Sequence, residues 1–222
     1  MKVLIIGAGG HARVIADALI SRNQLGEDNV VVGFLDDSDT LQDRELLGAR
    51  ILGRISEADK FDHDAVVIGI EDNLTRRSLY TEMKNRGEKL LTVVHPRATL
   101  AAGAMVGDGT VIFGGAVVNS GARIGSNVIL NPACTVGHDL TVASHAQIGT
   151  GVNLGGGVTV GEGASVCMGS AVLQNMTIGN WAVVGPGSAV IHNVIAFETV
   201  VGVPAATLQE QFTKNSTDDH NP

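Results

Sequence analysis

The chain has 222 residues, of which 29 are glycine, 44% are hydrophobic and only 3% are aromatic, and its formal net charge is −8. This composition favours a core of small aliphatic side chains packed against close backbone, and the negative charge argues against binding to nucleic acid or to an anionic membrane. No apolar run reaches the ~18 residues of a transmembrane helix, and the one near the N-terminus is too short for a signal peptide, so we expect a cytoplasmic protein without membrane insertion.

The segment KVLIIGAGGHARVIADALI predicts a buried strand, a glycine turn and a helix. Gly7, Gly9 and Ala12 fit the G-x-G-x-x-A pattern of dinucleotide-binding folds, and the next predicted strand, VVVGFLDD, ends on Asp36 and Asp37. In that pattern a phosphate approaches bare backbone at the N-terminus of the helix. The alternative is a tight turn between strand and helix that binds no ligand.

The next segments complete the first half of the chain. AVVIGI predicts a third strand, NLTRRSLYTEMKNR a helix, and LLTVVHP a fourth strand that leads to Pro96. Four strands amount to about half of a doubly wound sheet, whereas a full dinucleotide domain needs two such halves. We therefore expect residues 1–97 to form a Rossmann-like α/β domain that holds one nucleotide portion and not a whole NAD.

A six-residue repeat organises the second half. From Leu100 to Val190 every sixth residue is leucine, isoleucine or valine, 16 positions in all, whereas the 80 positions between them through Ile195 hold only 12 such residues. This period predicts short strands that turn a corner every six residues, with aliphatic side chains inside and glycine or asparagine at strained corners. Three such faces make one coil of a parallel β-helix about 25 Å long. We expect this domain at residues 98–196 and a C-terminal loop and tail at 197–222.

Together the two halves resemble a known family of enzymes. The motifs GAGGHARV, FLDD, IGIEDNLTRR, VVHPRA, ILNPACTVGHD, LGGGVTVGEG and VVGVPA occur in the same order in the hexapeptide-repeat sugar acetyltransferases, which include bacterial nucleotide-sugar N-acetyltransferases and sialic acid O-acetyltransferases of surface-glycan pathways. The resemblance implies a left-handed β-helix, a first domain that binds the nucleotide sugar, acetyl-CoA bound by the coil, and a homotrimer with sites between subunits.

The histidines of the repeat differ in what surrounds them. Metal ligation by His138 and His145 is disfavoured because only Asp139 offers a further ligand nearby, so we expect no metal site. His145 and His192 are expected to be solvated corner residues. A neutral imidazole suits the removal of a proton from an attacking amine, and an adjoining carboxylate can fix its tautomer. The resemblance selects His138 as the catalytic base and Asp139 as its partner.

The remaining site residues are implied by the resemblance. Relatives carry a second histidine that contacts the acetyl donor nine residues after the catalytic one, and this chain has Gln147 there. The residues aligned with substrate contacts are Gly9, Gly10, His11, Asp36, Asp37, Gly69 and Asn131, and those aligned with acetyl-CoA contacts are Gln147, Met168 and Pro186. Cys134 and Cys167 match neither a disulfide framework nor a zinc spacing, and we expect both to be reduced core thiols.

The sequence thus predicts an acetyl-CoA-dependent N-acetyltransferase that acts on a UDP- or GDP-linked 4-amino-deoxysugar. One alternative is O-acetylation of a sugar hydroxyl, as on a sialic acid. Another is a nucleotide- or NAD-binding module in which the coil is only a trimerising scaffold.

Overall fold

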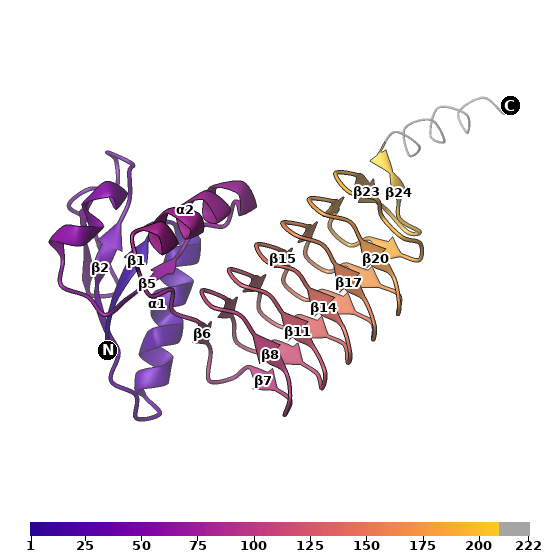
Figure 1. The fold of residues 1–222 in the computed structure, drawn as a ribbon, viewed down its shortest axis with the longest axis horizontal. Coiled ribbons are helices and arrows are strands. Elements are labelled where there is room, and N and C mark those ends of the chain that lie inside the picture. The colour runs from indigo at the N-terminus through magenta and orange to yellow at the C-terminus, as the bar shows by residue number, and fades with distance from the viewer. Residues whose placement is uncertain (209–222) are drawn as a thin grey trace, which may run out of the picture.

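The computed structural model describes residues 1–208 and consists of an α/β unit followed by a β-helix (Figure 1). The sheet of the first unit has the strand order β3-β4-β2-β1-β5. Its strands are parallel, except that β3 and β4 form an antiparallel hairpin. The elements of this unit are β1 (Lys2–Ile6), α1 (Gly10–Asn23), β2 (Val30–Leu35), β3 (Glu45–Leu46), β4 (Ala49–Gly53), the 3-10 helix η1 (Ile55–Lys60), β5 (Ala65–Ile68) and α2 (Asn73–Asn85).

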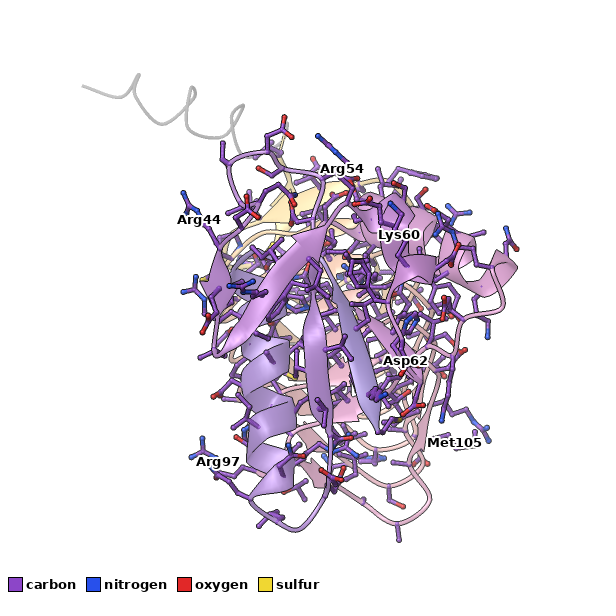
Figure 2. The ribbon with its side chains drawn as sticks, turned by 90° about the vertical axis from the view of Figure 1, so that its left-hand side faces the viewer. Arg44, Arg54, Lys60, Asp62, Arg97 and Met105 are labelled. Atoms are coloured by element: carbon purple, nitrogen blue, oxygen red, sulfur yellow. The ribbon has the colours of Figure 1, made fainter. Side chains whose placement is uncertain are left out.

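Both faces of this sheet are covered, as the continuous apolar strands require. On β1, Val3 and Ile5 pack toward α1 and toward the coil, whereas Leu4 and Ile6 pack toward η1 and α2. The core that holds α1 also includes Val111 and Phe113 of the coil. Seen from the end that carries the α/β unit (Figure 2), the sheet stands in front of the coil, and the labelled Arg44, Arg54, Lys60 and Asp62 belong to the α/β unit. Helix α1 therefore joins the two units through shared apolar packing.

The predicted strand LLTVVHP is wrong as a fourth strand of this sheet. Leu90 forms only an isolated parallel bridge with Val66, and β6 (Val93–Val94) already pairs with the coil strand β9. The fourth parallel strand is β4, which the sequence pattern did not predict. Strand pairing of the coil thus begins before the expected boundary at residue 98, and β23 (Thr199–Val201) continues it into the predicted C-terminal loop. The rest of the predicted tail, from residue 209, lies outside the described residues.

The coil is a left-handed parallel β-helix, as predicted. Its strands stack into three sheets, with the orders β22-β19-β16-β13-β10-β7, β20-β17-β14-β11-β8 and β24-β23-β21-β18-β15-β12-β9-β6. The bounds are β7 (Thr99–Leu100), β8 (Met105–Val106), β9 (Val111–Ile112), β10 (Val117–Val118), β11 (Arg123–Ile124), β12 (Ile129–Leu130), β13 (Thr135–Val136), β14 (Thr141–Val142), β15 (Gln147–Ile148), β16 (Asn153–Leu154), β17 (Thr159–Val160), β18 (Ser165–Val166), β19 (Ala171–Val172), β20 (Thr177–Ile178), β21 (Val183–Val184), β22 (Ala189–Val190) and β24 (Ala206–Thr207).

The six-residue repeat builds the core of this coil. The repeated aliphatic residues from Ile112 to Val190 are all buried in one cluster, and Leu100 and Val106 pack against it partly buried. Every sixth residue from Gly103 to Gly187 has a positive φ, including Asn127, Ala133, Asp139, His145, Asn175 and Trp181. Glycine is therefore not required at each corner. Directly after the aliphatic residue, glycine is required at Gly137, where a Cβ would lie 2.6 Å from the carbonyl carbon of Gly155 in the next coil, whereas other turns of the repeat carry Phe113 or Leu173 at this position.

A polar cluster around Asp108 fastens α2 to the first coils. The Asp108 carboxylate accepts hydrogen bonds from Tyr80 Oη (2.8 Å) and Ser126 Oγ (2.5 Å) and pairs with Lys84 Nζ at 2.7 Å. Partial burial alone would raise the pKa of Asp108, but the hydrogen bonds from these three partners outweigh it and lower the pKa from 3.8 to about 2. The ionised carboxylate is therefore favoured in the folded state.

We expect Asp108→Asn to lower the free energy of unfolding by about 1 kcal/mol at pH 7, because solvent screens this partly exposed ion pair. Since the folded-state pKa lies below the unfolded one, the contribution is present above about pH 4 and is lost as the pH falls toward about 2. Urea unfolding at pH 7 and pH 3 measures this. The stabilising role of the Asp108 carboxylate would be contradicted if Asp108→Asn lost the same free energy of unfolding at both pH values. It would also be contradicted if this loss were no larger than that of the exposed control Asp28→Asn.

Candidate active site

A groove of about 740 Å³ lies between the N-terminal end of α2 and the coil face formed by β12, β15, β18 and β21. Its lining includes Glu71, Asn131, Gln147, Cys167, Met168 and Trp181. Its walls come from segments far apart in the sequence, which the coil register and the packing of α2 bring together. A groove of this volume accommodates an extended small-molecule ligand.

Three of the residues predicted to contact the ligands line this groove, namely Asn131, Gln147 and Met168. Met168 is 65% exposed and lies one coil above Thr150, which also lines the groove. Pro186 lies one coil above Met168, where the N–H of Gly187 donates to the carbonyl of Met168, but Pro186 is not part of the lining. Thr150, Met168 and Pro186 thus stack in consecutive coils, and the first two line the groove.

His138 and Asp139 form the predicted pair, but they lie away from the groove. The Nδ1–H of His138 donates to Oδ2 of Asp139 across 2.9 Å, and both side chains are exposed. This bond leaves Nε2 as the basic nitrogen of a neutral ring. A Cβ on Gly156 would lie 2.6 Å from this Nε2, so the glycine leaves the space that the imidazole occupies.

The pair sits at the corner between β13 and β14, whereas the groove lies on the face that contains β12 and β15. In a three-sided coil this corner is the edge opposite that face. One copy of the chain therefore does not bring His138 to its own groove. His192 is exposed at the same edge, as predicted.

The expectation that His145 is a solvated corner residue is wrong. Its Nδ1 lies 2.8 Å from Nδ2 of Asn127, which donates to it, and its ring meets the Tyr80 ring edge-on at 5.3 Å. Burial lowers the pKa of His145. The carbonyl of His145 also accepts a hydrogen bond from Arg76, so this histidine belongs to the contact between α2 and the coil.

The N-terminal end of α1 is open to solvent, as a phosphate site requires. Gly9 is the N-cap and carries no capping side chain, and a Cβ on Gly9 or on Gly10 would meet no atom within 4 Å. Gly7 has φ 99° and lies so close to Ile70 that a Cβ would be 2.6 Å from its Cδ1. The free N–H groups of the first helical turn can therefore bind an anion.

His11 lies where this helix meets the coil. Its ring packs edge-on against Phe113 at 5.3 Å, and within residues 1–208 its buried Nε2 has no hydrogen-bond partner. Burial, with a further contribution from the nearby Arg76 charge, lowers the pKa of His11 to about 4. The ring is therefore neutral at pH 7.

Asp36, Asp37 and Gly69 each have a structural contact in this chain. Asp36 accepts from the N–H of Ala8 (2.8 Å) and of Ser38 (2.9 Å), and Asp37 accepts from the N–H of Ile55 at 3.0 Å. A Cβ on Gly69 would lie 2.7 Å from Cα of Ala12, so this glycine permits β5 and α1 to approach. Their alignment with nucleotide-binding positions stays a prediction.

The cysteines differ in their surroundings. Cys134 is fully buried, and burial raises the pKa of its thiol to about 12, which confirms it as a core residue. Cys167 is a free thiol as expected, but its expected place in the core is wrong, because it is only partly buried and lines the groove. Among residues 1–208 no group of three potential ligands could hold a metal ion, and no helix there is long and apolar enough to cross a membrane.

Two groove residues that the sequence analysis did not single out are Glu71 and Trp181. Oε1 of Glu71 accepts a hydrogen bond from Nε2 of Gln147 across 2.9 Å, although 76 residues separate them in the chain. Trp181 lies under the guanidinium of Arg77, 5.4 Å from the ring centroid. The position of Glu71 after β5 was a usable signal, since ligands bind at the carboxyl ends of parallel strands.

Arg76 holds the loop that carries Glu71. Its side chain is buried, and it donates to the carbonyls of Glu71 (2.6 Å) and His145 (2.8 Å) and to Oδ1 of Asn73 (2.7 Å). Burial lowers the pKa of Arg76 to about 10, so it stays charged at pH 7. One guanidinium thereby fixes the groove wall against the coil.

We expect Arg76→Lys to reduce the free energy of unfolding by roughly 2–4 kcal/mol, because an ammonium cannot reach all of these acceptors and leaves buried carbonyls unpaired. Urea unfolding followed by circular dichroism measures the loss. Arg77→Lys is the matched control, since Arg77 is exposed. Equal stability of the two variants would contradict the conclusion that Arg76 holds the groove wall against the coil.

Comparisons with known proteins agree with this architecture. Residues 2–83 match the family model described as the PglD N-terminal domain. A search of curated protein sequences finds no significant match. Among solved structures, a perosamine N-acetyltransferase mutant from Caulobacter crescentus in complex with CoA and GDP-perosamine shares 28% identity and a TM-score of 0.86 over 93% of this chain and 96% of that one.

Two further solved structures are similar over nearly their whole length. The acetyltransferase domain of PglB from Neisseria gonorrhoeae, solved also with acetyl coenzyme A, shares 29% identity and a TM-score of 0.86, with 93% of this chain and 99% of that chain covered. WeeI from Acinetobacter baumannii has the same fold at 23% identity, with a TM-score of 0.83 over 94% of this chain and 100% of that one. The match therefore extends across both units of the fold.

Proposed function

We propose that this chain, a hexapeptide-repeat sugar acetyltransferase, transfers the acetyl group of acetyl-CoA to the amino group of a nucleotide-linked amino sugar. One observation carries the proposal: a relative with the same two-unit fold binds CoA and GDP-perosamine together. We expect the acceptor to be a UDP- or GDP-linked 4-amino-deoxysugar of surface-glycan biosynthesis. A cytoplasmic location is part of the proposal, because acetyl-CoA is the donor.

The acetyl donor is assigned to the groove beside β15 and β18. Its partly apolar lining near Met168 and Thr150 suits an extended pantetheine arm. Gln147 lies at the position where relatives carry a second histidine, and its amide can donate to the acetyl carbonyl. Acetyl-CoA is thus a co-substrate that the coil binds.

The acceptor is assigned to the neighbouring end of the α/β unit. The open N-terminus of α1 at Gly9 and Gly10 suits the diphosphate, because its N–H groups and helix dipole favour an anion. His11 and Asn131 lie between this end and the donor groove, since His11 contacts Phe113 one coil below Asn131. The sugar ring would occupy this space, and Asp36, Asp37 and Gly69 would stand near the nucleoside.

His138 is proposed as the base for the transfer. The amine attacks the thioester carbonyl, the new C–N bond forms, and Nε2 of His138 takes the proton that the nitrogen loses. Collapse of the tetrahedral intermediate then breaks the C–S bond, and the protonated His138 returns a proton to the CoA sulfur. Asp139 orients the ring and stabilises the imidazolium.

A homotrimer would complete this site. His138 stands on the edge opposite the groove of its own chain, so the proposal requires His138 of one copy to reach the groove of a neighbour. Two exposed apolar residues, Leu173 (52%) and Ile191 (42%), lie on the coils above His138, and Phe197 (76%) lines the groove. These side chains suit a contact between copies.

We expect His138→Ala to lower kcat by about 10²–10⁴-fold while the melting temperature is unchanged, because the side chain is exposed and acts as a general base. The assay follows CoA release with UDP- and GDP-linked amino sugars, and His192→Ala is the matched control. The product must resist mild alkali, since an amide survives conditions that cleave an O-acetyl ester. The proposal would be contradicted by an alkali-labile product or by full activity of His138→Ala. It would also be contradicted if NADH alone raised the melting temperature of the protein.

A second expectation concerns the division of the site between copies. Met168→Trp fills the groove, and His138→Ala removes the base, so each homotrimer should be inactive. A mixture assembled from both variants should regain activity, because some sites then combine an open groove with a neighbour that carries His138. The measurement is CoA release after joint refolding, with each variant refolded alone as control. Absence of any rescue in proven mixed trimers would show that both groups act within one chain.

A further inference from the structure

Glu71 is a carboxylate in the groove to which no role has been assigned. It follows the carboxyl end of β5 and precedes Asp72, the N-cap of α2, and its side chain is exposed at the groove lining. This places it where the α/β unit meets the coil. It therefore stands between the proposed acceptor region and the proposed donor groove.

Two contacts hold Glu71 in place. Its Oε1 accepts from Nε2 of Gln147 across 2.9 Å, and its backbone carbonyl accepts from Nη1 of the buried Arg76 across 2.6 Å. Most exposed glutamates sample many rotamers, which costs entropy when they bind a ligand. A glutamate held at its backbone and at its carboxylate is already ordered before the ligand arrives.

Within residues 1–208 no cation forms an ion pair with this carboxylate. The charge of Arg76 interacts with Glu71 electrostatically, but the Arg76 guanidinium donates its N–H groups to the carbonyls and the amide described above and none to the carboxylate. His11, which also interacts electrostatically with Glu71, is neutral at pH 7. The adjacent Asp72 adds further negative charge, and Gln147 on β15 is uncharged. By contrast, Glu162 near the groove pairs with Arg77 at 3.5 Å.

An ordered, unpaired carboxylate beside the reaction site is complementary to a cation. We propose that Glu71 binds the protonated amino group of the acceptor sugar and thereby selects amino sugars over their hydroxyl counterparts. The proposal rests on the proposed function. It adds a specificity residue from the α/β unit, which Gln147 positions from the coil.

The proton balance is compatible with the transfer step. Oxygen atoms of Glu71 accept N–H bonds from the ammonium and guide the nitrogen to the groove. The ammonium first releases one proton to solvent, so His138 of a neighbouring copy is still neutral when the free amine attacks. His138 then takes the second proton from the nitrogen as the C–N bond forms, the C–S bond breaks, and His138 returns that proton to the CoA sulfur. Glu71 is not consumed and exchanges no proton.

Glu71→Gln tests the proposal, because it removes the charge and keeps an oxygen that can accept from Gln147. At pH 7 we expect kcat/KM for the amino sugar to fall about tenfold, mainly through KM, as for the loss of a charge-assisted hydrogen bond. An amine flanked by electron-withdrawing groups titrates near pH ~8. The loss should therefore shrink toward pH 9, where the acceptor is neutral, and KM for acetyl-CoA should stay unchanged.

Two control variants separate the possible causes of a lower kcat/KM in Glu71→Gln. Glu162→Gln removes the same charge from the rim and should leave both KM values unchanged. Gln147→Ala should raise KM for acetyl-CoA at every pH, so a Glu71→Gln variant that behaves in the same way would show that Glu71 only positions Gln147. Circular dichroism and the melting temperature establish that each variant is folded.

The outcomes also distinguish a failure of the role assigned to Glu71 from a failure of the proposed function. The assignment of Glu71 alone would be overturned if the wild-type enzyme is active and Glu71→Gln keeps the full kcat/KM for the amino sugar. It would also be overturned if this kcat/KM falls by the same factor at pH 7 and at pH 9. A folded wild-type protein that acetylates no nucleotide-linked amino sugar would overturn the proposed function itself.

Discussion

The 18-residue register of the β-helix is the constraint on which the rest of the structure depends. Each strand pairs with the strand one coil above in the same register, as Val118 does with Val136 and Thr135 with Asn153. The corner backbone is left-handed every sixth residue, which keeps the coil triangular. Because no insertion breaks this pattern, residues 18 positions apart stack in one column on the same side of the coil. This register fixes the positions of the columns that contain His138 and Met168.

A second constraint turns the regular coil into a site. The coil by itself offers only flat faces and edges, and the groove exists because α2 and the loop before it lie against one face. Arg76 makes this contact by donating to carbonyl oxygens of the loop and of the coil at once. Asp108 provides a second attachment near the other end of α2. Acceptor and donor regions are therefore held at a fixed separation by a polar joint and not by apolar packing alone.

How much of the site followed from the sequence depended on the kind of residue. The coil columns and the pairing of His138 with Asp139 were predictable, because both depend on spacing or adjacency in the chain. The surroundings of His145 were not, since its partners Asn127 and Tyr80 come from another coil and from α2. The same holds for Glu71, whose bond to Gln147 crosses from one unit to the other. The strand LLTVVHP was misassigned because a short apolar run does not specify which sheet it joins.

By itself the sequence determined the period of the coil, its aliphatic interior and the glycine turn before α1, because these follow from local backbone preferences and from which side chains avoid water. It could not determine which face of the coil forms the groove, or that His138 lies on the edge opposite that face. Those features depend on how α2 packs against one of three similar faces. That choice is made by a few long-range hydrogen bonds, above all those of Arg76, whose partners lie up to 69 residues away in the chain.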